Sequence, residues 1–379
     1  MNISLLTGAY KNAGDFLIVD RCKKLLRYVY PDCNIVEYER RKPLNDCLET
    51  IDRSDCLIMA GGPAYQRNIY PQSIPLVDDL SRIKVPIFGI GLGWKGETNS
   101  NTVLYNYRFS EKTLSLLYRM QKDGTVLPCR DWYSVRALRN NGFKNVVMTG
   151  CPAWYNIDFL NSVSADNILQ KNHIENKGVI AISDPAYACN FDLVSVVIDE
   201  LNERYPQSKK VLLFHRGVGV DKDTPEKLGI MQQKLYEKVV TDYPNIEIVD
   251  ASRGIEKLSI YENCDLHIGF RVHAHIYNLS MGNHSLLIEE DARGAGVNEI
   301  FGLPSVKTYN DYRIAPSIVD IVKRRRVDNP RNLFFSKNIA DMLDRYEAIK
   351  TFQYNHIVNL IKSYFVVCRD YIEGFAKHI

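Results

Sequence analysis

Short apolar runs alternate with amphipathic segments through the first 155 residues. Strands are predicted at Asn2–Leu6, Asn34–Tyr38, Cys56–Ala60 and Val85–Ile90. Asp15–Tyr30 carries apolar residues at helical spacing and predicts a helix. Glycine follows three of these strands, at Gly8, Gly61-Gly62 and Gly91. Strand–helix alternation of this kind is typical of a parallel sheet, whose ligand sites lie at the carboxyl ends of the strands.

The same alternation restarts after a polar stretch at 161–177. Strands are predicted at Gly178–Ser183, Lys210–Phe214, Ile246–Val249, Leu266–Phe270 and Ser285–Glu289. Helices are predicted at Leu193–Arg204, Lys227–Tyr243, Ile255–Asn263 and Ala274–Met281. We therefore expect an α/β protein with two Rossmann-like domains facing a cleft, the GT-B-like architecture. The expected domains are residues 1–160 and 178–330, joined by the linker 161–177.

Residues 331–379 differ, because no strand follows their helical pattern. Two helices are predicted, at Asn338–Lys350 and Asn355–Gly374, and we expect them to pack back on the N-terminal domain. The basic run Lys323–Arg326 precedes them. Either a solvated face or peripheral contact with an acidic membrane surface accounts for that run.

Composition excludes several classes of protein. The 379 residues are 45% hydrophobic and 25% charged, as in soluble globular proteins, and the net charge of +3 does not indicate a nucleic-acid partner. Apolar runs fall far short of the ~20 residues that span a bilayer, and the N-terminus lacks a signal-peptide pattern. The nine scattered cysteines form no CxxC pair, so we expect buried thiols, no metal site and a cytoplasmic protein.

The first candidate site residues are Asn12, Gly14 and Asp15, between the first strand and helix. Gly14 allows the backbone to approach a ligand. Asp15 can serve as an N-cap, which accounts for it without any ligand. The pattern is not GxGxxG, so a dinucleotide fingerprint is absent.

Two further candidates follow predicted strands. Arg130 comes after Thr125–Pro128 and enters a helix that also carries Ser134; its guanidinium can hold a carboxylate or phosphate, or simply pair with Asp131 at the surface. Arg216 follows Lys210–Phe214 beside His215, where a ligand role and a surface role are equally supported.

The sharpest candidate is the turn after Leu266–Phe270, which holds Arg271, Val272, His273 and His275. On an extended turn, Arg271 and His273 point the same way. An arginine and a histidine converging at a strand end favour an anion clamp with a proton donor. His275 lies farther into the helix, where a structural role is favoured.

Six short motifs in one order carry a resemblance. They are Asn12-Ala13-Gly14-Asp15, Gly61-Gly62, Gly91-Leu92-Gly93, Arg130-Asp131 with Ser134, Gly150-Cys151-Pro152-Ala153, and Arg271-Val272-His273-Ala274. Over residues 1–310 the chain resembles the polysaccharide pyruvyl transferase family. The resemblance implies transfer of the pyruvyl group of phosphoenolpyruvate to a saccharide, forming a pyruvate ketal for a surface polysaccharide. The implied acceptor is lipid-linked or nucleotide-linked, at the inner face of the membrane, and no further cofactor is implied.

The resemblance also implies roles. Arg130 and Arg271 grip the carboxylate and phosphate, the backbone at Val272 lines the pocket, His273 is the general acid and Asp15 orients an acceptor hydroxyl. Two positions depart from the family pattern, Val272 in place of leucine and Pro63 in place of glycine. The arginines at strand ends predict a locally cationic pocket in a nearly neutral protein.

The acidic stretch Glu289–Asp291 supports a different reading. In GT-B glycosyltransferases an acidic residue of the second domain holds a nucleotide ribose, so a nucleotide-sugar glycosyltransferase is the alternative. A saccharide-binding protein without turnover is a third reading, but it would be expected to lack the Arg271–His273 pair.

Overall fold

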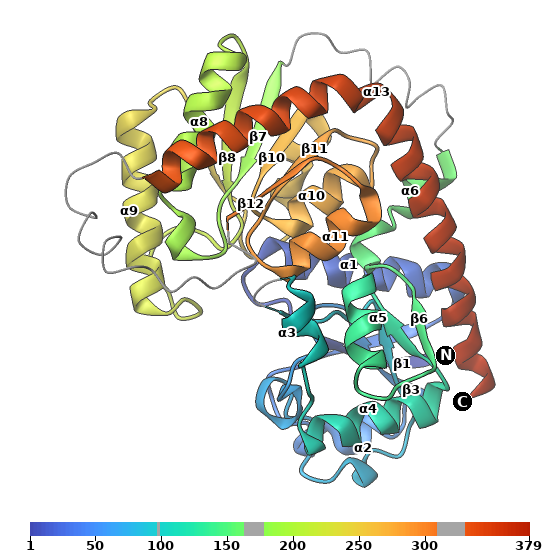
Figure 1. Cartoon of the computed structure of the whole chain (residues 1–379). Coiled ribbons are helices and arrows are strands. Elements are labelled where there is room, and N and C mark those ends of the chain that lie inside the picture. Colours follow the sequence, from blue (N-terminus) through green and yellow to red (C-terminus); the bar gives the residue numbers. More distant parts are fainter. Residues whose placement is uncertain (97–98, 163–177, 309–329) are drawn as a thin grey trace. The chain divides into compact units, whose positions relative to one another are not determined.

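The computed structural model describes residues 1–96, 99–162, 178–308 and 330–379 (Figure 1). They divide into two compact units. The first consists of Met1–Tyr10, Asp15–Ser162 and Asn359–Ile379; the second of Lys11–Gly14 and the described residues from 178 to Val358. Most of the predicted linker 161–177 and all of the basic run Lys323–Arg326 lie outside the described residues.

A four-stranded parallel sheet forms the centre of the first unit. Its order is β2-β1-β3-β4, with β1 at Asn2–Thr7, β2 at Asn34–Glu39, β3 at Cys56–Ala60 and β4 at Ile87–Ile90. Every residue of β3 and β4 is buried, as the continuous apolar pattern of these strands requires. A separate parallel pair joins β5 (Leu127–Cys129) to β6 (Val146–Met148).

The helices of the first unit begin with α1 (Ala13–Val29), whose first two residues belong to the second unit. The others are α2 (Leu48–Ile51), α3 (Asn101–Tyr105), α4 (Glu111–Gly124), α5 (Trp132–Arg139) and α6 (Ile157–Ser162). The sequence pattern did not predict α4, although the helix is N-capped by Ser110, whose hydroxyl accepts from the Thr113 N–H.

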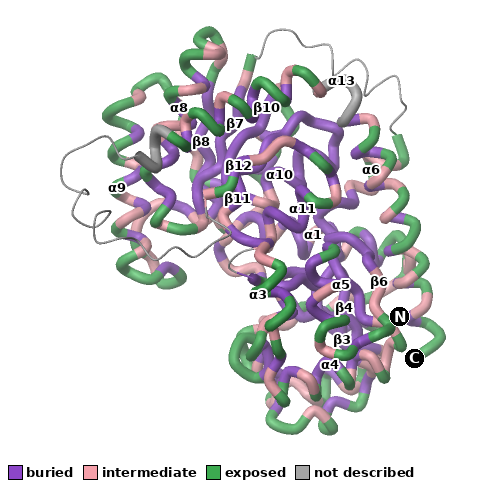
Figure 2. The backbone as a smooth tube through the Cα atoms, viewed as in Figure 1, coloured by how far each residue is buried: buried purple, intermediate pink, exposed green. Residues whose placement is uncertain are grey.

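The second unit contains a six-stranded parallel sheet in the order β12-β11-β10-β7-β8-β9. The strands are β7 (Val179–Ser183), β8 (Lys209–Phe214), β9 (Glu247–Asp250), β10 (Leu266–Gly269), β11 (Ser285–Glu289) and β12 (Ser305–Lys307). Read from β9, this is the doubly wound Rossmann order 3-2-1-4-5-6. Its direction reverses between β7 and β10, which pair directly. The central strands are buried (Figure 2).

Helices of the second unit connect these strands. They are α8 (Leu193–Arg204), α9 (Glu226–Asp242), α10 (Val272–Leu279) and α11 (Ala292–Phe301), with a 3₁₀ segment at Glu256–Asn263. The two parallel sheets and the intervening helices confirm the predicted α/β class with two Rossmann-like units, the components of a GT-B-like fold.

The C-terminal region is one continuous helix, α13 (Pro330–Glu373), and not the two predicted helices. Neither glycine nor proline lies between Lys350 and Asn355, so nothing there stops a helix. Its residues up to Val358 belong to the second unit and those from Asn359 to the first. In the first unit, the ring of Phe375, which follows α13, stacks on Phe88 with centroids 4.2 Å apart.

No helix in the described ranges has the length and apolar character needed to cross a membrane.

Tyr354 of α13 provides a test of how this helix holds the second unit. Its buried hydroxyl accepts from the Ser285 N–H at 2.9 Å and donates to the Ser285 carbonyl at 3.1 Å. Tyr354→Phe leaves both backbone groups unsatisfied and should cost about 1–3 kcal/mol of stability. Urea denaturation measures this. The matched control is Tyr118→Phe, at an exposed ring, which should shift stability by less than ~0.5 kcal/mol. Equal effects of the two variants would contradict the assigned contact.

Candidate functional site

The carboxyl ends of β7 and β10 hold the strongest candidate site of the second unit. These adjacent strands flank the point where the strand order reverses, which is where ligands bind in doubly wound sheets. Asp184 directly follows β7, and Arg271 lies between β10 and α10. A pocket at this position is lined by Asn12, Ala186, His215, Phe270, Arg271, Val272, His273, Glu290, Asp291 and Arg293.

Asp184 and Arg271 form a buried, two-pronged ion pair. Arg271 Nε donates to Asp184 Oδ1 at 2.8 Å, and Nη2 donates to Oδ2 at 2.6 Å and to the Pro185 carbonyl at 3.0 Å. The two side chains are 1% and 7% exposed. Removing one partner of such a pair leaves an uncompensated charge, which typically costs ~3–5 kcal/mol. Arg271 is therefore fixed in direction before any ligand arrives.

A glycine and a serine set the close approach of the two strand ends. A side chain at Gly269 would place its Cβ 2.6 Å from the backbone N and O of Ser183, so only glycine fits. Ser183 Oγ accepts from the Arg271 N–H at 3.1 Å. The start of the Arg271 turn is thus tied to β7 through both backbone packing and a side-chain hydrogen bond.

Buried histidines extend this contact behind the pocket. His267 lies 3.0 Å from Ser183 Oγ through Nε2 and 2.7 Å from Ser285 Oγ through Nδ1, and His275 Nδ1 lies 2.7 Å from the same Ser285 hydroxyl. Burial lowers the pKa of His267 well below its usual range and that of His275 to about 3, so both rings are neutral. The structural role favoured for His275 agrees with this position.

His273 is the second residue of α10, so the predicted extended turn was wrong. Only Arg271 is extended, as the residue before the helix, and His273 lies in the first helical turn. Its ring packs against Gly14, where a Cβ would overlap it. This contact gives the glycine of the Asn-x-Gly-Asp motif its physical reason. The N–H groups of a first helical turn also suit an anion.

His215 enters the same pocket from the end of β8. Its N–H donates to Asp184 Oδ1 at 3.0 Å, and its carbonyl accepts from the Ala13 N–H at 3.0 Å. Burial, together with the charge of Arg271, lowers the pKa of His215 well below its usual range. The neutral ring can give or accept a hydrogen bond but does not act as a cation.

Carboxylates from the end of β11 complete the lining. Glu290 accepts from the Ala186 N–H at 2.7 Å, the Tyr187 N–H at 3.1 Å and Asn190 Nδ2 at 2.7 Å. Burial raises the pKa of Glu290 to about 7 despite these donors. Asp291 caps α11 and pairs with Arg293 at 2.7 Å. Burial alone would raise the pKa of Asp291, but the Arg293 guanidinium outweighs it and the pKa is lowered.

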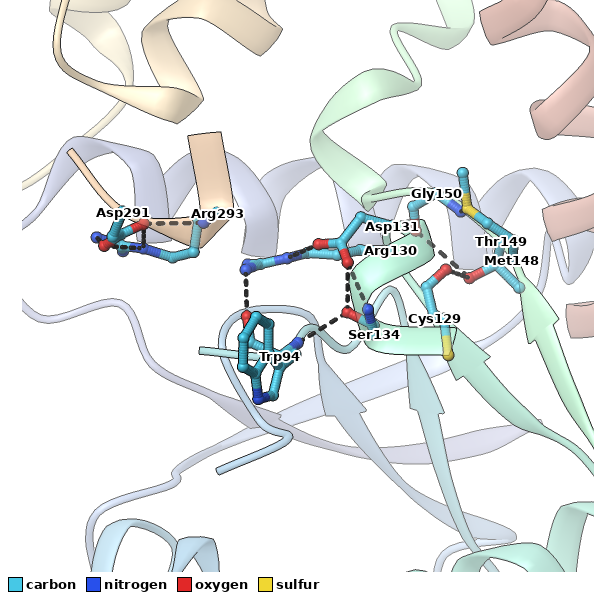
Figure 3. A network of polar contacts seen from close by, with 10 residues as sticks. All are labelled: Trp94, Cys129, Arg130, Asp131, Ser134, Met148, Thr149, Gly150, Asp291 and Arg293. Carbon is cyan, nitrogen blue, oxygen red and sulfur yellow. Dashed lines mark hydrogen bonds and ion pairs between the residues drawn. The ribbon is translucent and has the colours of Figure 1, made fainter. Parts of the chain in front are cut away.

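Arg130 belongs to a buried network of the first unit, part of which is drawn in Figure 3. Its Nε donates to Asp131 Oδ2 at 3.1 Å and its Nη2 to the Trp94 carbonyl at 3.2 Å. Asp131 caps α5 by accepting from both the N–H and the hydroxyl of Ser134, at 2.7 Å each. The Arg130–Asp131 pair considered from the sequence is present, but it is buried and not at the surface.

The sequence-predicted residues thus separate into two groups. Asn12, Arg271, Val272 and His273 line the pocket of the second unit, and Gly14 touches His273. Half-buried Arg216 follows β8 but is not among the lining residues. Arg130, Ser134 and Asp15 belong to the first unit. Asp15 is the third residue of α1, so it is not an N-cap.

The prediction of a simply cationic pocket was wrong, because the arginines carry their own carboxylates. Arg130 pairs with Asp131, Arg271 with Asp184 and Arg293 with Asp291. Asp184 was missed, although it follows a predicted strand in the same way as Arg271 and His215. Within the described ranges, His, Cys, Asp and Glu form no group of three or more that could hold a metal ion.

Comparison with solved structures finds many distant likenesses. UDP-GlcNAc 2-epimerase from Neisseria meningitidis, bound to UDP-GlcNAc, aligns at 12% identity and a TM-score of 0.48, covering 91% of this chain and 100% of its own. A putative UDP-N-acetylglucosamine 2-epimerase from Listeria monocytogenes aligns at 11% identity and a TM-score of 0.49, covering 96% of each chain. At this level of similarity the matches say nothing of the substrate of this chain. No curated protein sequence matches it.

The family comparison is more extensive. The profile of the family described as polysaccharide pyruvyl transferase matches residues 12–290. The match begins at Asn12 and ends at Glu290, so it includes both the Asn-x-Gly-Asp motif and the Arg271–His273 turn. It covers well over half of the 379 residues. This chain belongs to the polysaccharide pyruvyl transferase family.

Proposed function

We propose that the protein transfers the pyruvyl group of phosphoenolpyruvate to a saccharide, forming a pyruvate ketal during surface polysaccharide biosynthesis. The observation that carries the proposal is the placement of Arg271 and His273 on one pocket at the switch point of the second unit, in a chain of this family. The proposed acceptor is lipid-linked or nucleotide-linked and is used on the cytoplasmic side of the membrane. No cofactor is needed beyond the donor itself.

Recognition of phosphoenolpyruvate requires hydrogen-bond donors directed at its carboxylate and its phosphate. Arg271 donates from Nε and Nη2 to Asp184 and Pro185, so Nη1 is the nitrogen proposed to donate to the ligand. The N–H groups of the first turn of α10, at Val272 and His273, supply a second set of donors with the helix dipole behind them. Arg130 of the first unit is proposed as a further donor on the resemblance alone.

The proposed reaction begins with a sugar hydroxyl adding to the central carbon of phosphoenolpyruvate. His273, as imidazolium, gives a proton to the methylene carbon, which becomes the methyl group. Asp15 is proposed to orient the attacking hydroxyl. The first hydroxyl releases its proton to solvent as its oxygen bonds to the carbon, and solvent returns a proton to the neutral His273 ring. Phosphate then leaves, the second hydroxyl adds to the same carbon, and its proton goes to phosphate or solvent. Donors fixed in advance stabilise the charge that develops on the departing phosphate.

The alternative, a nucleotide-sugar glycosyltransferase, rests on the acidic stretch Glu289–Asp291. Glu289 accepts from Asn298 Nδ2 at 2.8 Å and from the Ser305 hydroxyl at 2.6 Å, within the core. Glu290 and Asp291 likewise accept several hydrogen bonds from the chain itself. Structural roles therefore account for all three carboxylates without a ribose.

Ligand-dependent thermal stability separates the two functions. Phosphoenolpyruvate at saturating concentration should raise the melting temperature, because a ligand that binds only the folded state stabilises it. Nucleotide sugars that do not serve as acceptors should leave the melting temperature unchanged. Stabilisation by a nucleotide sugar alone would overturn the pyruvyl proposal. Phosphate release then distinguishes the two roles of a nucleotide sugar that binds. One that binds as the acceptor supports release of phosphate from phosphoenolpyruvate, whereas one that binds as a glycosyl donor does not.

His273→Gln tests the general acid. The variant keeps a polar side chain of similar reach but cannot donate a proton at neutral pH, so turnover should fall ~10²–10⁴-fold. The dissociation constant for phosphoenolpyruvate, measured by calorimetry, should stay within a few-fold. His356→Gln, at an exposed histidine of α13, is the control for folding and expression. Wild-type turnover in His273→Gln would remove the assigned role.

Glu290→Gln tests the charge balance of the pocket. With a pKa of about 7, Glu290 is mostly protonated below pH 7 and mostly ionised above it, so it repels an anion only at higher pH. Wild-type protein should therefore bind phosphoenolpyruvate more tightly at pH 6 than at pH 8, after the titration of the ligand itself is subtracted. Glu290→Gln should lose that difference. Identical pH profiles of the two proteins would show that this carboxyl does not face the bound donor.

A further inference from the structure

One ring nitrogen of His215 makes no hydrogen bond to any residue that the structure describes. Its side chain is buried and its backbone is fixed at both ends, by Asp184 and Ala13. Nε2 lies 2.7 Å from the Tyr261 hydroxyl. Nδ1 is buried and has no hydrogen-bond partner among the described residues.

The partner of Nε2 decides which nitrogen carries the hydrogen. Tyr261 is fully buried, and within the described residues its hydroxyl contacts no acceptor other than His215. We assign the hydroxyl as the donor to Nε2, because its hydrogen finds no other acceptor within the described residues. A neutral imidazole that accepts at Nε2 carries its hydrogen on Nδ1. Nδ1–H is thus a buried donor without an acceptor in the described part of the chain.

A buried donor of this kind is rare in native proteins and costs stability unless something else satisfies it. His215 lines the pocket at the switch point, and the charges of Arg271 and His273 act on its ring. His215 and Arg271 therefore line one pocket. An N–H beside a fixed guanidinium suits an anionic oxygen.

We propose that His215 binds the anionic donor directly, giving a neutral hydrogen bond from Nδ1–H to a carboxylate or phosphate oxygen held beside Arg271. It is a binding residue and moves no proton. The identity of the ligand as phosphoenolpyruvate rests on the proposed function, whereas the anion site itself does not.

Two isosteric variants test the assignment. Asparagine places its amide near the position of Nδ1, and glutamine places its amide near that of Nε2. His215→Asn should keep the dissociation constant for phosphoenolpyruvate within a few-fold, and His215→Gln should weaken binding about ten- to a hundred-fold, as expected for a lost hydrogen bond to a charged group. His356→Asn and His356→Gln, at the exposed histidine of the same unit, should both bind as wild type. If His215 only supports Tyr261, the order is reversed, with glutamine tolerated and asparagine not; that result overturns the proposal.

Inorganic phosphate and pyruvate serve as parallel probes in the same calorimetric titrations. If the wild type binds one of these anions but not phosphoenolpyruvate, the proposed function fails. The dissociation constants of His215→Asn and His215→Gln are then compared for the anion that binds. If it binds none of the three, both proposals fail. Should either variant not fold, ¹⁵N NMR of the wild-type imidazole replaces it. The Nδ1 signal of His215 should be of the protonated type and should move on addition of ligand; a signal that does not respond overturns the proposal.

Discussion

The ion pair between Asp184 and Arg271 is the interaction on which the second unit's pocket depends. Asp184 follows β7, Arg271 follows β10, and the Asp184 carboxylate also accepts the N–H of His215 after β8. One buried carboxylate therefore joins the ends of three neighbouring strands. Its two oxygens set the direction of the guanidinium, the start of α10 and the backbone that carries His215. A charge pair this deeply buried is costly to form, so it is present in the folded protein only with its full set of partners.

Pairing changes how the pocket can recognise an anion. An arginine with its own carboxylate contributes little net charge, so long-range attraction is weak and recognition depends on the direction of individual N–H groups. The fixed guanidinium, the first turn of α10 and the neutral ring of His215 are donors of this type. Donors held in place need no reorganisation when charge moves during a reaction, which is the property that lowers a barrier. Gly14 and Gly269 permit the close packing that holds these donors, because a side chain at either position would collide with its neighbours.

The sequence located the strand end that carries Arg271 and His273, because an apolar run that stops at polar residues can be recognised from the chain alone. The apolar run before Phe270 and the polar residues after it predicted where Arg271 and His273 would lie, and the parallel sheet confirms that position. Partners across the sheet could not be predicted in the same way. Asp184 is 87 residues from Arg271, and only the pairing of β7 with β10 brings them together.

Local geometry was the other source of error. Helix α10 begins one residue after Arg271, so the spacing of Arg271 and His273 follows a helical turn and not an extended one. The C-terminal helix is continuous because the interval between its two apolar stripes contains no residue that ends a helix. In both cases the sequence indicated the type of element nearby but not where the helix begins or how far it continues.

A crystal structure of the protein with phosphoenolpyruvate would locate the bound donor. We predict the ligand at the carboxyl ends of β7 and β10, with one anionic oxygen on Arg271 Nη1, another within reach of His215 Nδ1, and the methylene carbon facing the His273 ring. The Asp184–Arg271 pair should remain intact. Phosphoenolpyruvate bound elsewhere, or bound here only after Arg271 has turned away from Asp184, would contradict this prediction.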